Sequence, residues 1–195
     1  MSRPRISLVR LAQESIAEVL GTGDHAVDAT AGNGHDTLFL AQTVGPAGRV
    51  TAFDIQPVAL DATRRRLQEQ DLLAPVRLVA AGHETMEEHI KAPIRAAMFN
   101  LGYLPGGDKT VTTRTDTSLR GLDAACRLLA PGGRISVMVY TGHPGGGEEH
   151  DAVLAFLKEL GDNWRWQRAN PDGIPAAAPQ LFLLDLKLMG LKPTA

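Results

Sequence analysis

Short runs of apolar and β-branched residues alternate with helical patterns along almost the whole of this 195-residue chain. Each run is long enough for one strand, and each helical pattern is long enough to cross back over a sheet. Strand–helix–strand units of this kind place their strands side by side and parallel, with helices on the faces of the sheet. The alternation therefore predicts an α/β fold built on a mostly parallel sheet.

Seven segments have the composition expected of strands: residues 25–30, 49–54, 76–80, 94–100, 134–140, 163–170 and 180–189. Helical patterns cover residues 7–20, 112–129 and 147–160, and two more begin near Asp36 and at Pro57. Glycines 21 and 23 end the first helix, and Ala130-Pro-Gly-Gly133 ends the helix before the fifth strand. A loop rich in Pro and Gly, residues 171–179, joins the last two strands.

The terminal pair of strands, which follows five strand–helix units, resembles the end of the class I methyltransferase sheet. This resemblance implies a Rossmann-like, doubly wound, seven-stranded sheet whose last strand is antiparallel. A chain of 195 residues is long enough for one such domain and too short for two of typical size. We therefore expect a single domain over residues 1–195, with a helix within residues 1–21 packed on it.

Composition excludes several other classes of protein. The formal net charge of −2 lacks the basic surplus typical of proteins that grip long nucleic acids, although a local patch would suffice for a small RNA footprint. No apolar run is long enough to span a membrane, and Glu14 and Glu18 interrupt the basic start, so we expect a cytoplasmic protein without membrane contact. Cys126 is the single cysteine and fits a packing role, and the six histidines lack metal-ligand spacing, so we predict no metal.

A glycine-rich segment, Val27-Asp-Ala-Thr-Ala-Gly-Asn-Gly34, joins the first strand to the helix that follows it. Glycine lets the backbone turn sharply and approach a ligand closely. Ligands of open α/β sheets lie beyond the carboxyl ends of the strands, so this loop is where a nucleotide is expected. Taken alone, the pattern also fits a plain strand-to-helix turn.

Acidic residues around this loop favour a cationic cofactor. Asp28 is placed to accept hydrogen bonds from an ammonium group, and Asp54 ends the second strand, where a carboxylate can bind both ribose hydroxyls. The dinucleotide pattern Gly-x-Gly-x-x-Gly requires a third glycine where this chain has Thr37, and Asp36 would repel a phosphate at the helix start. The loop therefore favours the sulfonium and ammonium of S-adenosylmethionine over a nicotinamide dinucleotide.

After the third strand, Gly82 and His83 lie where methyltransferases of this fold hold the adenine, and His83 equally fits a cap of the next helix. The predicted cofactor-binding residues are Asp28, Ala29, Thr30, Gly32, Asn33, Gly34, Asp36, Thr37, Asp54, Ile55, Gln56, Gly82, His83 and Asn100.

Asn100-Leu-Gly-Tyr103 ends the fourth strand and resembles the Asn-Pro-Pro-Tyr motif of amino methyltransferases. The Asn100 side-chain oxygen and the Leu101 carbonyl can accept the hydrogens of a neutral amine and aim its lone pair at the methyl group. Gly102 allows a tight bend, and Tyr103 offers a face on which a base can stack. The competing interpretation is a simple turn with a surface tyrosine. We predict Asn100 and Tyr103 as catalytic residues, with Leu101 and Gly102 as substrate contacts.

Two further segments are expected to line the substrate site. Pro105-Gly-Gly-Asp-Lys109 would form a flap in which Asp108 pairs with a substrate ammonium and Lys109 with a phosphate, or else a solvated loop. Tyr140-Thr-Gly-His-Pro-Gly-Gly-Gly-Glu-Glu149 follows the fifth strand, and Tyr140 and His143 are predicted substrate contacts. His143 or Asp108 could serve as a general base. The alternative is a helix-entry loop in which Glu148 and Glu149 favour the helix dipole.

Other charged and aromatic side chains have simpler roles. Arg114 and Arg120 are basic residues near the transfer site that could meet RNA, whereas residues 64–66 read as a solvated helix face. Trp164 and Trp166 point to one face of a strand and fit core packing, with a dimer or RNA contact as the alternative.

Together, residues 28–41, 100–109 and 140–149 resemble a bacterial family long labelled as rRNA methylases and now understood as tRNA 5-aminomethyl-(2-thio)uridine methyltransferases. The resemblance implies that S-adenosylmethionine donates a methyl group to the exocyclic amine of the wobble uridine, giving 5-methylaminomethyl-(2-thio)uridine. It also implies a tRNA anticodon stem-loop as partner and a homodimer. The alternatives are an rRNA base methyltransferase, a small-molecule amine methyltransferase, a nicotinamide-dependent oxidoreductase and a cofactor-binding regulator.

Overall fold

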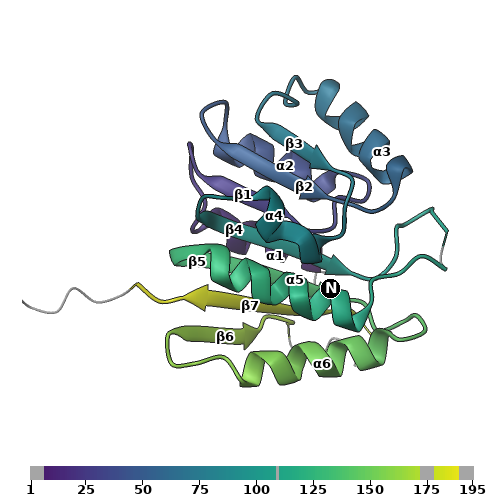
Figure 1. Ribbon diagram of the computed structural model, residues 1–195, viewed down its shortest axis with the longest axis vertical. Helices are drawn as coiled ribbons and strands as arrows, with labels where there is room; N and C mark the ends of the chain where they lie inside the picture. The colour runs from purple at the N-terminus through teal and green to yellow at the C-terminus, as the bar shows by residue number, and fades with distance from the viewer. Residues whose placement is uncertain (1–6, 109, 172–177, 189–195) are drawn as a thin grey trace, which may run out of the picture.

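The computed structural model describes residues 7–108, 110–171 and 178–188, which form one twisted sheet with helices on both faces (Figure 1). Within these residues the strands are β1 (His25–Asp28), β2 (Arg49–Phe53), β3 (Val76–Val79), β4 (Ile94–Leu101), β5 (Leu129–Val139), β6 (Trp164–Arg168) and β7 (Gln180–Leu186). The helices are α1 (Leu8–Ala17), α2 (His35–Val44), α3 (Pro57–Gln68), η1 (His83–Thr85), α4 (Met86–His89), α5 (Thr115–Leu128) and α6 (Gly146–Lys158).

The strand order is β3-β2-β1-β4-β5-β7-β6. Strands β1 to β5 pair in parallel, whereas β7 is antiparallel to both β5 and β6. The predicted doubly wound sheet with an antiparallel last strand is therefore confirmed. The order reverses between β1 and β4, and such a switch point opens a crevice at the carboxyl ends of the strands.

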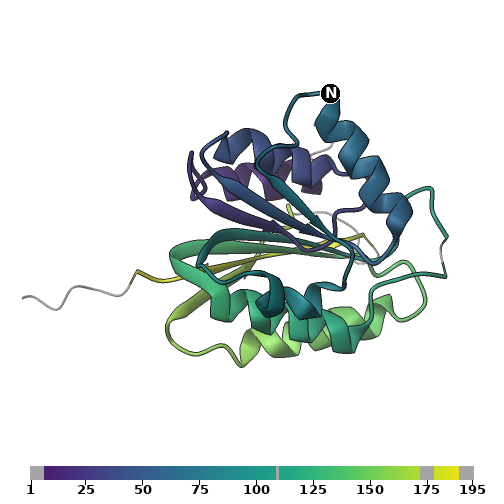
Figure 2. The same cartoon turned by 45° about the horizontal axis from the view of Figure 1, so that its top comes forward.

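Side chains of the central strands alternate between two cores. Along β4, Ala97 and Phe99 pack in the core shared with α5 and α6, whereas Met98 packs in the core shared with α1 and α2. Successive strand residues point to opposite faces, so a strand covered on both sides is apolar throughout. Figure 2 shows the result, with the purple and blue helices on one face of the sheet and the green helices on the other.

Of the element bounds, the start of β5 differs most from the prediction. Helix α5 ends at Leu128, as the Ala130–Gly133 breaker requires, but β5 already begins at Leu129 and includes that breaker. The pairing of β4 with β5 is irregular there, because Ile94 pairs with Leu129 and Ala96 already pairs with Arg134. Extra residues on one strand are the hallmark of a bulge. The structure also contains the short helices η1 and α4, for which the sequence pattern gave no separate helix.

Several packing predictions are confirmed. Trp164 and Trp166 are partly buried against the core of α5 and α6, and the Trp166 ring lies edge-on to Phe182 at a centroid distance of 6.4 Å. Cys126 packs partly buried against the same core, where burial raises the pKa of its thiol to about 12. Most of the predicted loop 171–179 lies outside the described residues. No helix in the described part of the chain is long and apolar enough to cross a membrane.

Candidate functional site

A cavity of about 330 Å³ opens at the carboxyl ends of β1, β2 and β4, where the switch point predicts one. Its lining includes eleven of the predicted site residues: Ala29, Thr30, Gly32, Asp54, Ile55, Gln56, Gly82, His83, Asn100, Gly102 and Tyr103. The volume falls within the range of pockets that hold small organic ligands. Residues that lie up to 74 positions apart in the chain, from Ala29 to Tyr103, thus share one cavity.

Asp54 organises the floor of this cavity. Its two carboxylate oxygens accept hydrogen bonds from the backbone amides of Gly32 and Gln56, both at 2.9 Å. The β1–α2 loop is thereby tied to the end of β2. Ile55 follows Asp54 and leaves 61 % of its surface exposed at the cavity, which gives the carboxylate an apolar neighbour. A carboxylate beside an apolar surface suits a ligand with hydroxyls next to a flat ring.

The structure places Asp28 beneath the loop, because its side chain is fully buried and does not line the cavity. It accepts hydrogen bonds from the Thr37 hydroxyl at 2.6 Å and from the Thr30 amide at 3.1 Å. Burial, reinforced by the nearby Asp36 charge, raises the pKa of Asp28. Asp28 and Thr37 hold the loop against the start of α2.

Asp36 connects the loop to the predicted transfer residue. One of its oxygens accepts a hydrogen bond from the Asn100 side-chain amide and the other from the Gln13 side-chain amide, both at 2.7 Å. Asp36 is only 7 % exposed. A carboxylate only accepts hydrogen bonds, so it selects the NH₂ end of Asn100 and leaves the side-chain oxygen to accept from another group. Nothing in the sequence pattern indicated Gln13, which lies on α1.

His83 lies in the wall of the cavity and begins η1. Its Nδ1 is 3.1 Å from the Ala29 carbonyl, and its ring meets Phe99 edge-on at 5.6 Å. Burial lowers the pKa of His83, so the ring is neutral near pH 7. An added β-carbon at Gly121 would come within 2.4 Å of the ring, so α5 approaches this histidine as closely as a glycine allows. His83 lines the cavity, and its contact with an adenine stays a prediction. The N-cap of η1 is Gly82, so the interpretation of His83 as a helix cap is wrong.

The chain after Asn100 folds back over the cavity as a closed loop. Tyr103 pairs with Thr112 in an isolated antiparallel bridge, and the Thr113 amide donates to the Gly102 carbonyl at 2.8 Å. The Asn33 side chain donates to the Pro105 carbonyl at 3.1 Å. The segment of residues 102–114, which we name the flap segment, therefore bridges from β4 to the β1–α2 loop.

The second glycine-rich segment supports the flap segment from outside the cavity. The Glu149 carboxylate in the first turn of α6 is 1 % exposed and accepts hydrogen bonds from Thr113 at 2.8 Å and Ser118 at 2.7 Å. The His143 ring meets the Tyr103 ring edge-on at 6.1 Å. Burial raises the pKa of the half-buried Tyr140, which therefore stays protonated at neutral pH. Glu149 does more than favour a helix dipole, since it ties α6 to the start of α5.

The remaining predicted residues lie around the cavity without lining it: Asp28, Asn33, Gly34, Asp36, Thr37, Leu101, Asp108, Tyr140 and His143. Lys109 lies outside the described residues. Asp108 binds the amide and hydroxyl of Thr110 at 2.8 and 2.7 Å, so it shapes a turn. Those contacts lower the pKa of its carboxyl group.

Residues that the sequence analysis did not place in the site come mostly from the flap segment. Leu104, Val111, Thr112 and Thr113 line the cavity, as do Thr117 and the predicted RNA contact Arg114. Pro105, which begins the predicted flap, lines it as well. The sequence could have indicated them by their position after β4, which ends at the sheet edge where the cavity opens.

One expectation about arginines needs correction, and another stays a prediction. The Arg66 guanidinium donates to the Asn33 carbonyl at 2.7 Å, so this residue braces the glycine loop instead of lying on a solvated face. Arg114 and Arg120 both pair with Asp116, at 3.4 and 3.6 Å. These exposed pairs reduce the free positive charge beside the cavity.

Comparisons with known proteins agree with this geometry. The model of the family described as "Putative rRNA methylase" matches residues 50–184. The chain is 44 % identical over 149 residues to the "tRNA (mnm(5)s(2)U34)-methyltransferase, chloroplastic" of Arabidopsis thaliana, covering 71 % of this chain and 54 % of that protein. It is also 30 % identical, over 61 % of its length, to a ubiquinone/menaquinone biosynthesis C-methyltransferase of Ectopseudomonas mendocina, of which it covers 43 %. The chain spans about half the length of these curated relatives.

Solved structures match over nearly the full chain. A "putative rRNA-methylase" from Clostridium thermocellum superposes with a TM-score of 0.90 at 38 % identity, covering 94 % of this chain and 99 % of that one. A "putative methyltransferase" from Streptococcus mutans in complex with SAH superposes with a TM-score of 0.82 at 37 % identity, covering 94 % and 98 %.

Proposed function

Because this chain belongs to the family described as "Putative rRNA methylase", we propose that it transfers a methyl group from S-adenosylmethionine to an amine on tRNA. The acceptor we propose is the exocyclic amine of 5-aminomethyl-(2-thio)uridine at the wobble position of the anticodon. The observation that carries the proposal is the Asp36–Asn100 contact, which orients an amide oxygen at the rim of the cavity. The similarity to the plant tRNA methyltransferase supports the choice of RNA.

The donors and acceptors of the cavity suit the chemical groups of S-adenosylmethionine. Asp54 presents a carboxylate, held by two backbone amides, to the ribose hydroxyls, and Ile55 and His83 offer surfaces for the adenine. Asp36 places a negative charge near the bound sulfonium and ammonium while remaining covered itself. When bound, the cofactor supplies an electrophilic methyl group on a positively charged sulfur.

Asn100 is the residue that we propose positions the amine. Asp36 fixes the amide so that its oxygen accepts one hydrogen of the amine. The Leu101 carbonyl, the second acceptor predicted from the sequence, instead accepts the Tyr140 amide at 2.9 Å. The Asn100 backbone amide donates to the Thr30 hydroxyl at 2.8 Å, which fixes the end of β4 to the β1–α2 loop. The hydrogen bond to the Asn100 oxygen directs the nitrogen lone pair away from that oxygen and toward the cavity. Orientation of this kind supplies much of the rate enhancement in a bimolecular transfer.

Transfer of the methyl group to a neutral amine needs no strong base at the nitrogen. The nitrogen lone pair forms the new N–C bond while the C–S bond breaks and its electron pair returns to sulfur. The amine gains a positive charge and then loses a proton, for which water or His143 at the flap segment is the acceptor. Tyr103, which is 37 % exposed at the mouth of the cavity, provides the aromatic face for the uridine ring. Homodimer formation is a separate prediction, which light scattering of the purified protein tests.

Nucleoside mass spectrometry of tRNA carrying 5-aminomethyluridine, after incubation with the protein and S-adenosylmethionine, tests the proposal. We expect that nucleoside to gain one methyl group. Calorimetry of S-adenosylhomocysteine binding to the same sample separates the two parts of the proposal. Tight binding without methyl gain would refute the tRNA substrate and direct the search to rRNA and small amines, and absence of binding would refute the cofactor.

Asp54→Ala tests the cofactor part of the proposal, and Asp61→Ala is its matched control. Loss of the carboxylate removes hydrogen bonds to the ribose, and we expect the affinity for S-adenosylhomocysteine to fall by about 1–3 kcal/mol. Asp61→Ala, which removes an exposed carboxylate paired with Arg64, should leave that affinity unchanged. Equal affinities in the two variants would contradict the assigned role of Asp54.

A further inference from the structure

A second cavity, of about 360 Å³, lies at the opposite edge of the sheet from the candidate methyl-transfer site. It is formed at the amino ends of β1, β2 and β3 and by the turn after α4. Five of its ten lining residues are basic or imidazole side chains, and none is acidic: His25, Arg49, Arg77, His89 and Lys91. A chain with a net charge of −2 thus gathers positive charge in one hollow.

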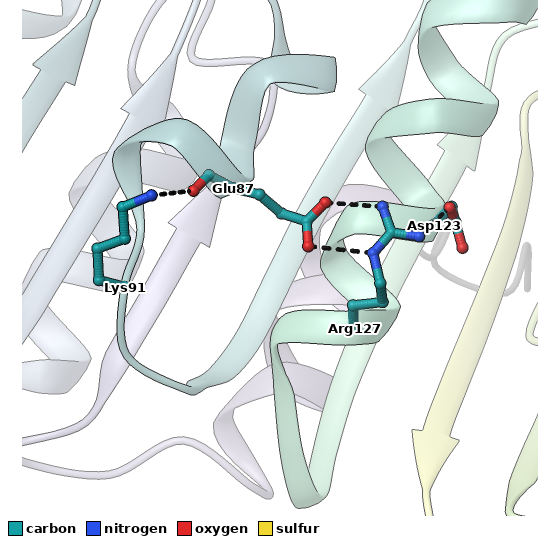
Figure 3. A network of polar contacts seen from close by, with 4 residues as sticks. All are labelled: Glu87, Lys91, Asp123 and Arg127. Atoms are coloured by element: carbon teal, nitrogen blue, oxygen red, sulfur yellow. Dashed lines mark hydrogen bonds and ion pairs between the residues drawn. The ribbon is translucent and has the colours of Figure 1, made fainter.

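Two of the positive charges in this cavity, those of Arg77 and Lys91, are held by neutral partners. Arg77 donates to the His89 carbonyl at 3.0 Å, and Lys91 donates to the Glu87 carbonyl at 2.8 Å. The Glu87 carboxylate extends in the other direction and binds Arg127 on α5 at 2.7 and 3.0 Å (Figure 3). Neutral acceptors fix the side chains without cancelling their charge, so the cavity keeps a positive potential.

His25 adds a directed donor to the cavity. Its Nε2 lies 3.0 Å from the Thr51 hydroxyl, while its Nδ1 is buried and has no hydrogen-bond partner among the described residues. Burial and the neighbouring Arg49 charge lower the pKa of His25 to about 4, so the ring is neutral at pH 7. A neutral imidazole carries one proton, and when Nε2 accepts from the Thr51 hydroxyl that proton is on Nδ1, the nitrogen without a partner among the described residues.

We propose that this cavity binds a backbone phosphate of the RNA substrate, with Arg49, Arg77, Lys91 and the His25 ring as its ligands. The inference rests on the proposed function, because it assigns positively charged RNA contacts to a chain whose net charge is negative. Strand β2 has 5 residues between the two edges, so the cavity is about 17 Å from the methyl-transfer site at about 3.3 Å per residue. An RNA stem whose loop enters the transfer site spans that distance.

Arg49→Gln, measured against Arg165→Gln, tests the inference. Both arginines are exposed strand residues, but Arg165 lies on β6 at the far edge of the sheet. Filter binding of the full chain to tRNA over a salt series, in the presence of S-adenosylhomocysteine, gives the dissociation constant and its salt dependence. We expect Arg49→Gln to raise the dissociation constant about 5-fold to 10-fold and to reduce the salt slope by about 0.9, the value for one lost phosphate contact. Arg49→Glu should weaken binding further.

The outcomes distinguish the inference from the proposed function. Arg165→Gln should stay within about 2-fold of the wild type, and the affinity for S-adenosylhomocysteine should be unchanged in all variants, which shows that they fold. Equal tRNA affinity and salt slope in the two Gln variants would overturn the inference, even if methyl transfer occurs. NMR shifts at His25 on titration with inorganic phosphate, without any effect of Arg49→Gln on tRNA binding, would also overturn it in favour of a free anion. Loss of methyl transfer alone, with the Arg49 effect intact, would overturn only the proposed reaction.

Discussion

Two chain segments meet over the candidate active site and are held in opposite ways. The β1–α2 loop, residues 28–37, is anchored from below by buried side chains: Asp28 and Thr37 bond to each other, and Asp36 bonds to Gln13 and Asn100. The flap segment, residues 102–114, is held mainly by its own turns, including the Gly107 amide to the Leu104 carbonyl at 3.0 Å and the Val111 amide to the Asp108 carbonyl at 3.1 Å.

The difference separates stability from recognition. Changes in the anchored loop disturb buried contacts with α1, α2 and α3, so they should alter the free energy of unfolding. Changes in the flap segment disturb few buried contacts, so they should alter substrate binding and turnover instead. Variants at matched positions in the two segments therefore test whether the two segments differ in this way.

The largest effect is expected from Gly34→Ala. Both Gly34 and Gly106 have a left-handed backbone, with φ of +78° and +81°, but a β-carbon at Gly34 would lie 2.8 Å from the Thr63 Cα, whereas nothing lies within 4 Å at Gly106. The left-handed conformation costs an alanine about 1–2 kcal/mol, and overpacking adds about 1–3 kcal/mol at Gly34. Urea unfolding followed by circular dichroism should show a loss of about 2–5 kcal/mol for Gly34→Ala and about 1–2 kcal/mol for Gly106→Ala. Equal losses would remove the distinction between the segments.

Asn100→Ala tests the junction between the segments. Loss of the oriented amide oxygen misplaces the amine, and we expect turnover of the aminomethyl tRNA to fall by about 10²-fold. The affinity for S-adenosylhomocysteine should stay within about 3-fold of the wild type. If the variant instead loses cofactor affinity while turnover of the bound complex is unchanged, Asn100 belongs to the cofactor site and the division of roles is wrong.

Tyr103→Ala tests recognition by the flap segment. Stacking of a base on an aromatic ring contributes about 1–3 kcal/mol, so KM for tRNA should rise by about 5-fold to 150-fold with little change in the free energy of unfolding. Tyr103→Phe keeps the ring and should keep KM close to that of the wild type. A loss as large in Tyr103→Phe would assign the effect to the hydroxyl group instead of the ring.

Asp28 gives the anchored loop a pH dependence. Its folded-state pKa is raised from 3.8 to about 7, chiefly by burial. The folded protein therefore retains a proton that the unfolded chain releases, and the stability present below about pH 4 is lost as the pH rises through about 7. Asp28→Asn cannot titrate, so the stability of the wild type relative to this variant should decline from about pH 4 to about pH 7. A constant difference over that range, measured by urea unfolding, would mean that Asp28 ionises normally.

Local pattern in the sequence was enough to predict the sheet and the place of the site. The alternation of strand and helix sets the topology, and parallel strands necessarily gather their carboxyl ends at one edge. The glycine loop, Asp54 and the Asn100–Tyr103 segment each end a strand, so their convergence follows from chain order. The stop signal at Ala130–Gly133 correctly ended α5, although it also became the irregular start of β5.

Which side chains face one another across elements depends on how the elements pack in three dimensions. Asp36 reads as a helix-start residue, yet its carboxylate meets Asn100 and Gln13, which lie 64 and 23 positions away. Arg66 reads as solvated, yet it braces Asn33. The basic cavity likewise brings together Arg49 of β2, Arg77 of β3 and Lys91 of the turn after α4. Such contacts depend on the packing distance and angle between elements. The periodicity of residues within one element carries no information about that distance or angle.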